Sequence, residues 1–272
     1  MPRALINGTD LHFEDTGGDR PALLLIAGLG ATGHIWGPLP RHLRAHFRVI
    51  SYDHRWLGRS GHAEPVSPCS IEDLVGDARG LLDHLGLERA NVLGKSLGGM
   101  IAQRLVLDDQ DRFDHLVLVA STAWISPHLY RIGEFFFTLA NNLTAAEYLH
   151  TVFTFCFAPD FHNRNGKTML HAEEKLTDAL GDVRVIARHV ESYRNLDFRE
   201  ELGQLRVPTL VVGGEQDLLI PHAQHRELAA CIPGAQMIAL EGVGHSPMRE
   251  SGPSLVRRIV AFLESPTAER VH

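Results

Sequence analysis

Hydrophobic residues along this chain fall into short continuous runs, separated by stretches with helical periodicity. Continuous apolar runs of four to eight residues are typical of parallel strands covered on both faces of a sheet. The runs that predict strands are Ala22–Ala27, Phe47–Tyr52, Ala90–Leu93, His115–Ala120, Pro208–Gly214 and Gln236–Leu240. The periodic stretches Ile71–Leu85 and Pro253–Leu263 predict helices, and Ser70 with Asp73 resembles a capping box. Strands alternating with helices in this order predict an α/β fold with a doubly wound, mostly parallel sheet.

The first residues follow a different pattern. Residues 3–16 alternate between apolar and polar around Asn7-Gly8, a turn pair typical of hairpins. We therefore expect an antiparallel hairpin ahead of the parallel strands, with Leu5, Leu11 and Phe13 facing inward.

The strand pattern disappears between residues 125 and 196, after the sixth predicted strand. This stretch is helical in character and rich in aromatic residues, including Phe135-Phe136-Phe137, Tyr148, Phe153, Phe155, Phe157, Phe161 and Tyr193. Most of these aromatic side chains are expected to pack the insertion on itself. We predict a first core part over 1–124, a helical cap over 125–196 and a second core part over 197–272. The cap is placed to form a wall of a substrate pocket.

Composition narrows the possible partners. The chain has 272 residues with 44% hydrophobic and 22% charged content, as expected for one globular α/β unit with an insertion. A net charge of -7 gives no basic surface for nucleic acid or for a membrane. No signal peptide or membrane-spanning run is recognised. Three scattered cysteines favour a reducing cytoplasm. We expect a cytoplasmic monomer or homodimer acting on a small-molecule substrate.

Histidine is abundant, with seventeen residues. His222 and His225 have helical spacing, but no third metal ligand is evident near them. We therefore predict no metal site and interpret the excess as surface composition.

A G-x-S-x-G motif lies at Gly94–Gly98, between the strand ending at Leu93 and an apolar helix start. This pattern is typical of a tight strand-to-helix turn that exposes a nucleophilic serine at a helix N-terminus. We predict that Ser96 is the nucleophile and that the N–H of Leu97 supplies half of an oxyanion hole. A phosphate-binding P-loop is the alternative, but it needs a glycine where this chain has Arg89.

A second glycine motif, Gly28-Leu29-Gly30-Ala31-Thr32-Gly33, follows the strand Ala22–Ala27. With Asp53 about 20 residues later, it matches the dinucleotide-binding fingerprint. That fingerprint requires a helix directly after the glycines, and here a glycine and two prolines oppose one. We therefore favour the alternative that the Leu29 N–H is the second oxyanion donor facing Ser96, with no cofactor.

Asp217 and His245 complete a candidate triad with Ser96. Each of the three residues lies just after a predicted strand, and such positions gather at one edge of a parallel sheet. The order nucleophile, acid, histidine is one of the few in which this triad occurs. His245 would act as general base, and Asp217 would orient it.

Taken together, these motifs resemble the α/β-hydrolase superfamily over essentially the whole chain. The nearest groups are similar to 3-oxoadipate enol-lactonase and aminoacrylate hydrolase. The resemblance implies a cofactor-free serine hydrolase of a small ester, lactone or amide. The segments that carry the resemblance are Gly94–Gly98, Gly28-Leu29-Gly30, Asp53-His54-Arg55, Gly213–Asp217 and Gly244-His245.

Three positions depart from the family's pattern and bear on the substrate. They are Ala27 before Gly28, Trp56 after Arg55, and Lys95 before the nucleophile. Lys95 could meet an anionic substrate or pair with a surface acid, and Trp56 could contact a ligand or pack. Two other functions remain alternatives: a lyase or cyclase using His245 as base, or a ligand-binding receptor with a vestigial triad. We predict that the substrate contacts Gly28, Gly30, Trp56, Lys95 and Trp124.

Overall fold

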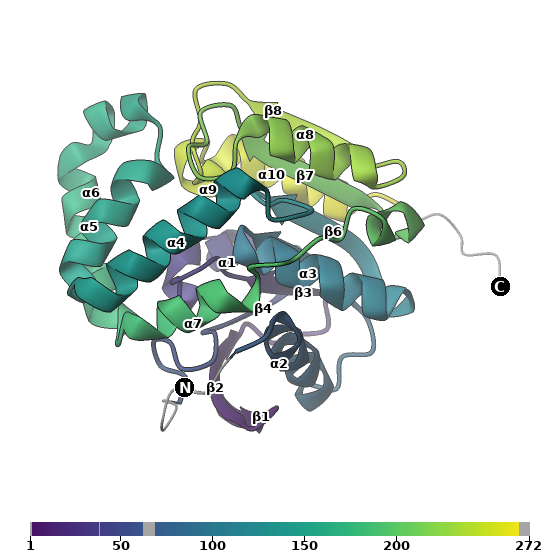
Figure 1. Ribbon diagram of the computed structural model, residues 1–272. Coiled ribbons are helices and arrows are strands. Elements are labelled where there is room, and N and C mark those ends of the chain that lie inside the picture. The colour runs from purple at the N-terminus through teal and green to yellow at the C-terminus, as the bar shows by residue number, and fades with distance from the viewer. Residues whose placement is uncertain (1, 38, 62–68, 267–272) are drawn as a thin grey trace.

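The computed structural model describes residues 2–37, 39–61 and 69–266. Its centre is one eight-stranded sheet in the order β1-β2-β4-β3-β5-β6-β7-β8 (Figure 1). From β4 through β3 to β8 all neighbouring strands are parallel, whereas β2 pairs antiparallel with both β1 and β4. This is the doubly wound, mostly parallel sheet that the hydrophobic pattern predicts. The strands are β1 Arg3–Ile6, β2 Thr9–Asp15, β3 Ala22–Ile26, β4 Arg48–Tyr52, β5 Ala90–Lys95, β6 Phe113–Val119, β7 Thr209–Gly214 and β8 Gln236–Leu240.

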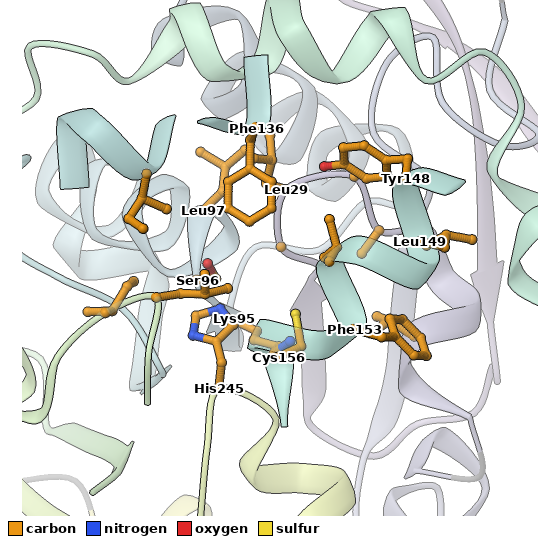
Figure 2. Close-up of a pocket in the computed structure, with 18 of the residues that line it drawn as sticks. Leu29, Lys95, Ser96, Leu97, Phe136, Tyr148, Leu149, Phe153, Cys156 and His245 are labelled. Carbon is orange, nitrogen blue, oxygen red and sulfur yellow. The ribbon is translucent and has the colours of Figure 1, made fainter. Parts of the chain in front are cut away.

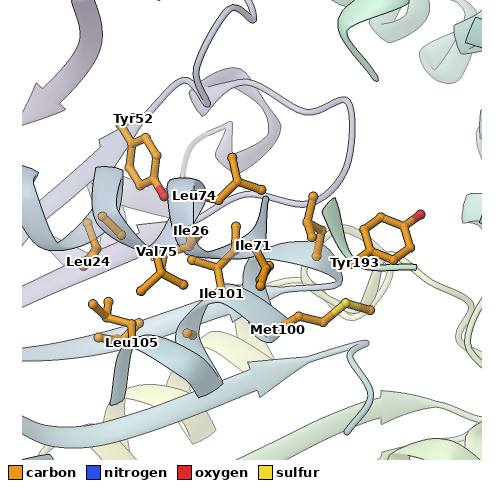
Figure 3. Close-up of a cluster of buried hydrophobic side chains, with 14 of the residues drawn as sticks. Leu24, Ile26, Tyr52, Ile71, Leu74, Val75, Met100, Ile101, Leu105 and Tyr193 are labelled. Atoms are coloured by element: carbon orange, nitrogen blue, oxygen red, sulfur yellow. The ribbon is translucent and has the colours of Figure 1, made fainter. Parts of the chain in front are cut away.

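The two faces of the sheet pack against different helices. Alternate residues of β3 separate accordingly: Leu24 and Ile26 join one buried cluster, whereas Leu23 and Leu25 join the other. The first cluster includes side chains of α2 Ile71–His84, α3 Leu97–Asp108 and α8 His222–Cys231, and Figure 3 shows part of it. The second includes side chains of α1 Leu39–Leu43 and α10 Pro253–Leu263. The remaining described core elements are α9 Pro247–Glu250 and the short 3-10 helices Gly33–Trp36, Gln110–Arg112 and Glu201–Gln204.

The N-terminal hairpin forms as expected, but one of its side chains faces the other way. Leu11 and Phe13 are buried, whereas Leu5 is 80% exposed. Leu5 pairs with Asp10, so it lies on the outer face of the hairpin. Its neighbours Ala4 and Ile6 are the buried residues of β1. The prediction for Leu5 was wrong because alternation continues across a turn only in the register that the turn imposes.

A second expectation fails just after the glycine motif. The structure has a 3-10 helix at Gly33–Trp36 and then α1 from Leu39, where a helix was not expected to start. Pro40 is the second residue of α1, and a proline is tolerated in the first turn because no intrahelical N–H bond is lost there.

Four helices lie between β6 and β7, in the stretch that was expected to form a cap: α4 Pro127–Asn142, α5 Ala145–Cys156, α6 Pro159–Leu180 and α7 Arg184–Ser192. They gather at one side of the molecule in Figure 1. The two ends of the cap meet through a bridge between Trp124 and Asp197, and the N–H of Ile125 donates to the Leu196 carbonyl over 2.9 Å. The chain therefore enters and leaves the cap at one place on the sheet.

Candidate active site

Ser96 occupies the turn between β5 and α3 in a conformation that few L-residues adopt. Its φ is 54° and its ψ is -120°, so the turn is strained and must be held by its surroundings. Glycine is required on both sides. A Cβ on Gly94 would lie 2.2 Å from the Gly98 carbonyl oxygen, and a Cβ on Gly98 would lie 2.1 Å from that of Ile26. This close packing of α3 against β5 and β3 lifts Ser96 above the edge of the sheet.

Asp217 and His245 follow β7 and β8, which are neighbours in the sheet. The Nδ1 atom of His245 lies 2.8 Å from Oδ2 of Asp217. Oδ1 of Asp217 accepts hydrogen bonds from the backbone N–H groups of Leu219 and Ile220, each over 2.9 Å. Burial opposes ionisation of this carboxyl group, but His245 and the backbone donor outweigh it and lower the pKa of Asp217. The acid is thus ionised and fixed against the histidine.

A further histidine, which the sequence analysis assigned to the surface, lies behind Asp217. His225 is fully buried on α8, and its Nε2 is 3.5 Å from Oδ2 of Asp217. The ring passes directly over Gly213, where a Cβ would lie 2.1 Å from Nδ1 of His225. Burial lowers the pKa of His225 to about 4, so the ring is neutral at pH 7. The expectation that the histidine excess is a surface feature was wrong for this residue.

The first glycine motif forms the wall opposite Ser96. A Cβ on Gly28 would lie 3.3 Å from the Cβ of Ser96, so only a glycine leaves the space in front of the serine open. Nε2 of His54 lies 2.9 Å from the Ala27 carbonyl oxygen and ties the start of the loop to β4. Its other end is held by Asp53, whose Oδ1 accepts from the Gly33 N–H over 2.7 Å. Asp53 is therefore a buried support of the loop.

A cavity of about 110 Å³ lies between this loop, the turn and the cap. Figure 2 shows Ser96 and His245 facing the same space, with cap side chains opposite them. Of the predicted site residues, Gly28, Leu29, Gly30, Lys95, Ser96, Leu97 and His245 line the cavity. Asp217 is behind His245. The cap contributes mostly apolar side chains, among them Phe136, Tyr148, Leu149, Val152, Phe153 and Cys156.

The two tryptophans predicted to contact substrate do not line this cavity. Trp56 is buried and its ring stacks on His189, with ring centroids 6.4 Å apart. The indole N–H of Trp124 donates to Glu227 over 2.9 Å at the base of the cap. Trp56 thus packs against the cap helix α7, and Trp124 bonds to the core helix α8, which leaves Lys95 as the departure from the family pattern that reaches the cavity.

Neither a metal cluster nor a membrane-spanning helix is found in the described part of the chain. No group of three or more histidine, cysteine, aspartate or glutamate side chains could hold an ion there. Among the same residues, no helix is both long and apolar enough to cross a bilayer.

Comparison with known sequences supports the same interpretation. Residues 21–251 match the family described as alpha/beta hydrolase fold. The protein named "Putative carbamate hydrolase RutD" from Caulobacter sp. strain K31 is 32% identical over 261 residues, covering 95% of this chain and 97% of that protein. Its counterpart in Azorhizobium caulinodans is 30% identical over 246 residues, covering 90% and 92%.

Solved structures give a matching result. The enol-lactonase from Burkholderia xenovorans LB400 superposes with a TM-score of 0.87 at 31% identity, covering 97% of this chain and 100% of that one. A hydrolase from Pseudomonas aeruginosa PA01 has a TM-score of 0.86 at 27% identity, covering 95% and 96%. These likenesses extend over the sheet and the cap.

Proposed function

Because the chain belongs to the α/β-hydrolase family, we propose that it is a serine hydrolase that cleaves a small ester, lactone or amide through an acyl-enzyme on Ser96. The observation that carries the proposal is the strained turn. It presents Ser96 to a cavity that His245 also lines, and Asp217 lies 2.8 Å from the far nitrogen of that histidine. A strained turn that exposes a single serine is typical of the nucleophile of a hydrolase.

In the first half of the reaction, Oγ of Ser96 attacks the substrate carbonyl carbon and Nε2 of His245 accepts the hydroxyl proton. Asp217 keeps the histidine in the tautomer with its proton on Nδ1 and stabilises the imidazolium that forms. The carbonyl oxygen becomes an oxyanion, and the backbone N–H groups of Leu29 and Leu97 donate to it. His245 then passes its proton to the leaving oxygen or nitrogen, and the acyl-enzyme remains.

In the second half, water takes the place of the leaving group. His245 removes a proton from the water as it attacks the acyl carbon, and the same two N–H groups hold the second oxyanion. The proton then returns to Oγ of Ser96 as the carbonyl reforms. The products are a carboxylic acid and an alcohol or amine, or a single hydroxy acid from a lactone.

The relatives support this substrate class. One is named as a carbamate hydrolase and another as an enol-lactonase. Carbamates and lactones both contain a carbonyl bonded to a heteroatom, the group that a serine nucleophile attacks. The small cavity and its mostly apolar cap side chains suit a short acyl group.

A fluorophosphonate probe tests the proposal. In the folded protein at pH 8 we expect the probe to label Ser96, as located by peptide mass spectrometry. Ser96→Ala should abolish labelling and lower ester hydrolysis by about 10⁶-fold, which leaves only the contribution of binding and the oxyanion donors. Ser254, an exposed serine on α10, provides the matched control variant Ser254→Ala.

The same experiment separates the alternatives. A lyase or cyclase that uses only His245 would keep its turnover in Ser96→Ala, and a receptor would show no turnover on any carbonyl substrate. Absence of labelling in folded protein would contradict the hydrolase proposal.

A further inference from the structure

Lys95 is a buried lysine in the wall of the cavity. It is the last residue of β5 and precedes the proposed nucleophile, and only 8% of its surface is exposed. The other two lysines of the chain, Lys167 and Lys175, are exposed on the cap helix α6. Figure 2 shows the Lys95 side chain passing beneath Ser96 toward Cys156. It is the one lysine or arginine among the described residues that line the cavity, and no carboxylate lines it.

No group of the described protein neutralises this lysine by direct pairing. Its ammonium group makes no ion pair with any described residue. The nearby carboxylates of Asp217 and Glu250 attract it from a distance. Both carboxylates already accept hydrogen bonds from other groups. Asp217 is bonded to His245, and Glu250 accepts N–H bonds from Gly244, Ser246 and Ala158.

Cys156 is the neighbour toward which the Lys95 side chain extends, and it provides no counter-charge at neutral pH. Burial raises the pKa of the Cys156 thiol to about 11, although Lys95 pulls it down, so the thiol stays protonated. The side chain of Arg249 adds repulsion. The charged form of Lys95 therefore has no anion paired with it among the described residues.

A buried ammonium without a partner is costly, and the cost falls when a ligand brings the missing negative charge. We propose that Lys95 binds the carboxylate of an anionic substrate, so that the preferred substrates are monoesters, lactones or amides that carry a second, free carboxylate. This inference rests on the proposed function and names the substrate class of the same site. The carboxylate would bind beside Cys156 while the reacting carbonyl lies at Ser96.

The electrostatics of the free site agree with this role. Burial lowers the pKa of Lys95, so the ammonium is held less firmly than on the surface. A carboxylate bound next to it would favour the charged form and raise the pKa again. An uncharged substrate cannot stabilise the ammonium in this way and would leave Lys95 without an ion-pair partner.

A matched pair of esters tests the inference. Monomethyl succinate and methyl butyrate have the same methyl ester and nearly the same length, and they differ in a terminal carboxylate. We expect the wild-type protein to favour the monoester in kcat/KM. In Lys95→Met, which keeps the length and removes the charge, the ratio of the two kcat/KM values should fall by about 10- to 100-fold, the effect of a charge-assisted hydrogen bond. Lys167→Met is the control and should keep the wild-type ratio.

Binding in the Ser96→Ala background gives a readout that does not depend on turnover. By calorimetry, adding Lys95→Met to Ser96→Ala should weaken binding of monomethyl succinate by about 10- to 100-fold. Equal ratios in wild type and Lys95→Met, or equal dissociation constants with and without Lys95, would overturn the inference. Binding that depends on Lys95 in a protein that hydrolyses neither ester would support the carboxylate subsite and contradict the hydrolase. Near-ultraviolet circular dichroism establishes that each variant is folded.

Discussion

At the scale of single residues, both oxygens of the Asp217 carboxylate are held by neighbouring groups of the protein. Oδ1 accepts from the N–H groups of Leu219 and Ile220, and Oδ2 lies 2.8 Å from His245 and 3.5 Å from His225. The three hydrogen bonds, to the two backbone N–H groups and to His245, fix the orientation of the carboxylate, whereas Nε2 of His225 makes no hydrogen bond. The orientation of His245 is therefore fixed from behind by the backbone that follows β7.

Asp217→Asn should reduce turnover by roughly 10⁴-fold, because the amide nitrogen would meet Nδ1 of His245 and favour the wrong tautomer. The backbone contacts to the remaining oxygen should keep the fold. Steady-state ester kinetics with thermal unfolding measures both effects. Asp178→Asn, an exposed position on α6, is the control. Near-normal activity of Asp217→Asn would mean that another carboxylate orients the histidine.

Several single side chains could not be placed from the sequence. The positions of Ser96, Asp217 and His245 at the ends of strands could be predicted because each follows a strand in a motif with fixed letters. Trp56 follows a strand as well, yet its ring turns inward to stack on His189 of the distant helix α7. His225 carries no motif, and its burial against Asp217 depends on the packing of α8 on Gly213. Contacts between segments far apart in the chain decide such cases.

At the scale of elements, Glu250 joins the cap to the loop that carries His245. Its carboxylate accepts from the N–H of Gly244 over 3.0 Å and from that of Ser246 over 3.1 Å, both in the histidine loop. It also accepts from the N–H of Ala158, between α5 and α6, over 3.0 Å. The cap and the loop touch here, since a Cβ on Gly244 would lie 2.7 Å from the Ala158 nitrogen. The Glu250 side chain thus positions both the cap and the loop that carries His245.

Glu250→Gln should therefore destabilise the protein and disturb the site together. An amide oxygen accepts more weakly than a carboxylate, and the NH₂ group would face a backbone donor. We expect a loss of about 1 to 3 kcal/mol in the free energy of unfolding, measured by urea denaturation, together with a lower kcat. Glu241→Gln, an exposed position after β8, should change neither quantity. Wild-type stability in Glu250→Gln would show that the cap is held to the loop by other contacts.

Elements with strong patterns could be predicted, and those set by their neighbours could not. The helix Pro253–Leu263 has the predicted ends, and Ser70 with Asp73 forms a complete capping box. These depend on residues within one turn of each other. The short helix α1 and the outward orientation of Leu5 depend on their surroundings, because Leu39 joins a buried cluster that includes side chains of α10 and Leu5 follows the register of a turn. The arrangement of the four cap helices around the cavity is likewise decided by packing between segments that are far apart in the sequence.

At the scale of the whole molecule, several histidines are buried as neutral rings. The clearest are His189, His54 and His225. Burial, with the adjacent His54, lowers the pKa of His189 to about 3, and burial also lowers the pKa of His54 and of His225, the latter to about 4. In the unfolded chain these side chains titrate near 6.5. Below that pH the unfolded state binds protons that the fold excludes.

The free energy of unfolding should consequently be greatest above pH 6.5 and decrease as the pH falls toward 4. Each such histidine adds up to about 1.4 kcal/mol per pH unit to the slope of the free energy of unfolding. Asp77 acts in the opposite direction, because burial raises its pKa and the folded protein gains that proton first. Carboxyl groups with lowered pKa, such as Asp217, add their losses only at the acid end of the range.

The variant His189→Phe removes the contribution of one histidine to the pH dependence of the free energy of unfolding. The phenyl ring can keep the stacking on Trp56, whose centroid is 6.4 Å away, and it cannot be protonated in the unfolded chain. In urea denaturation between pH 7.5 and pH 5, we expect the variant to lose stability less steeply than wild type, by about one proton's worth of slope below pH 6.5. His128→Phe, at an exposed position near the start of α4, should leave the slope unchanged. Identical slopes for His189→Phe and wild type would mean that the His189 ring is already protonated in the folded protein. The cap helix α7 would then contain a buried positive charge.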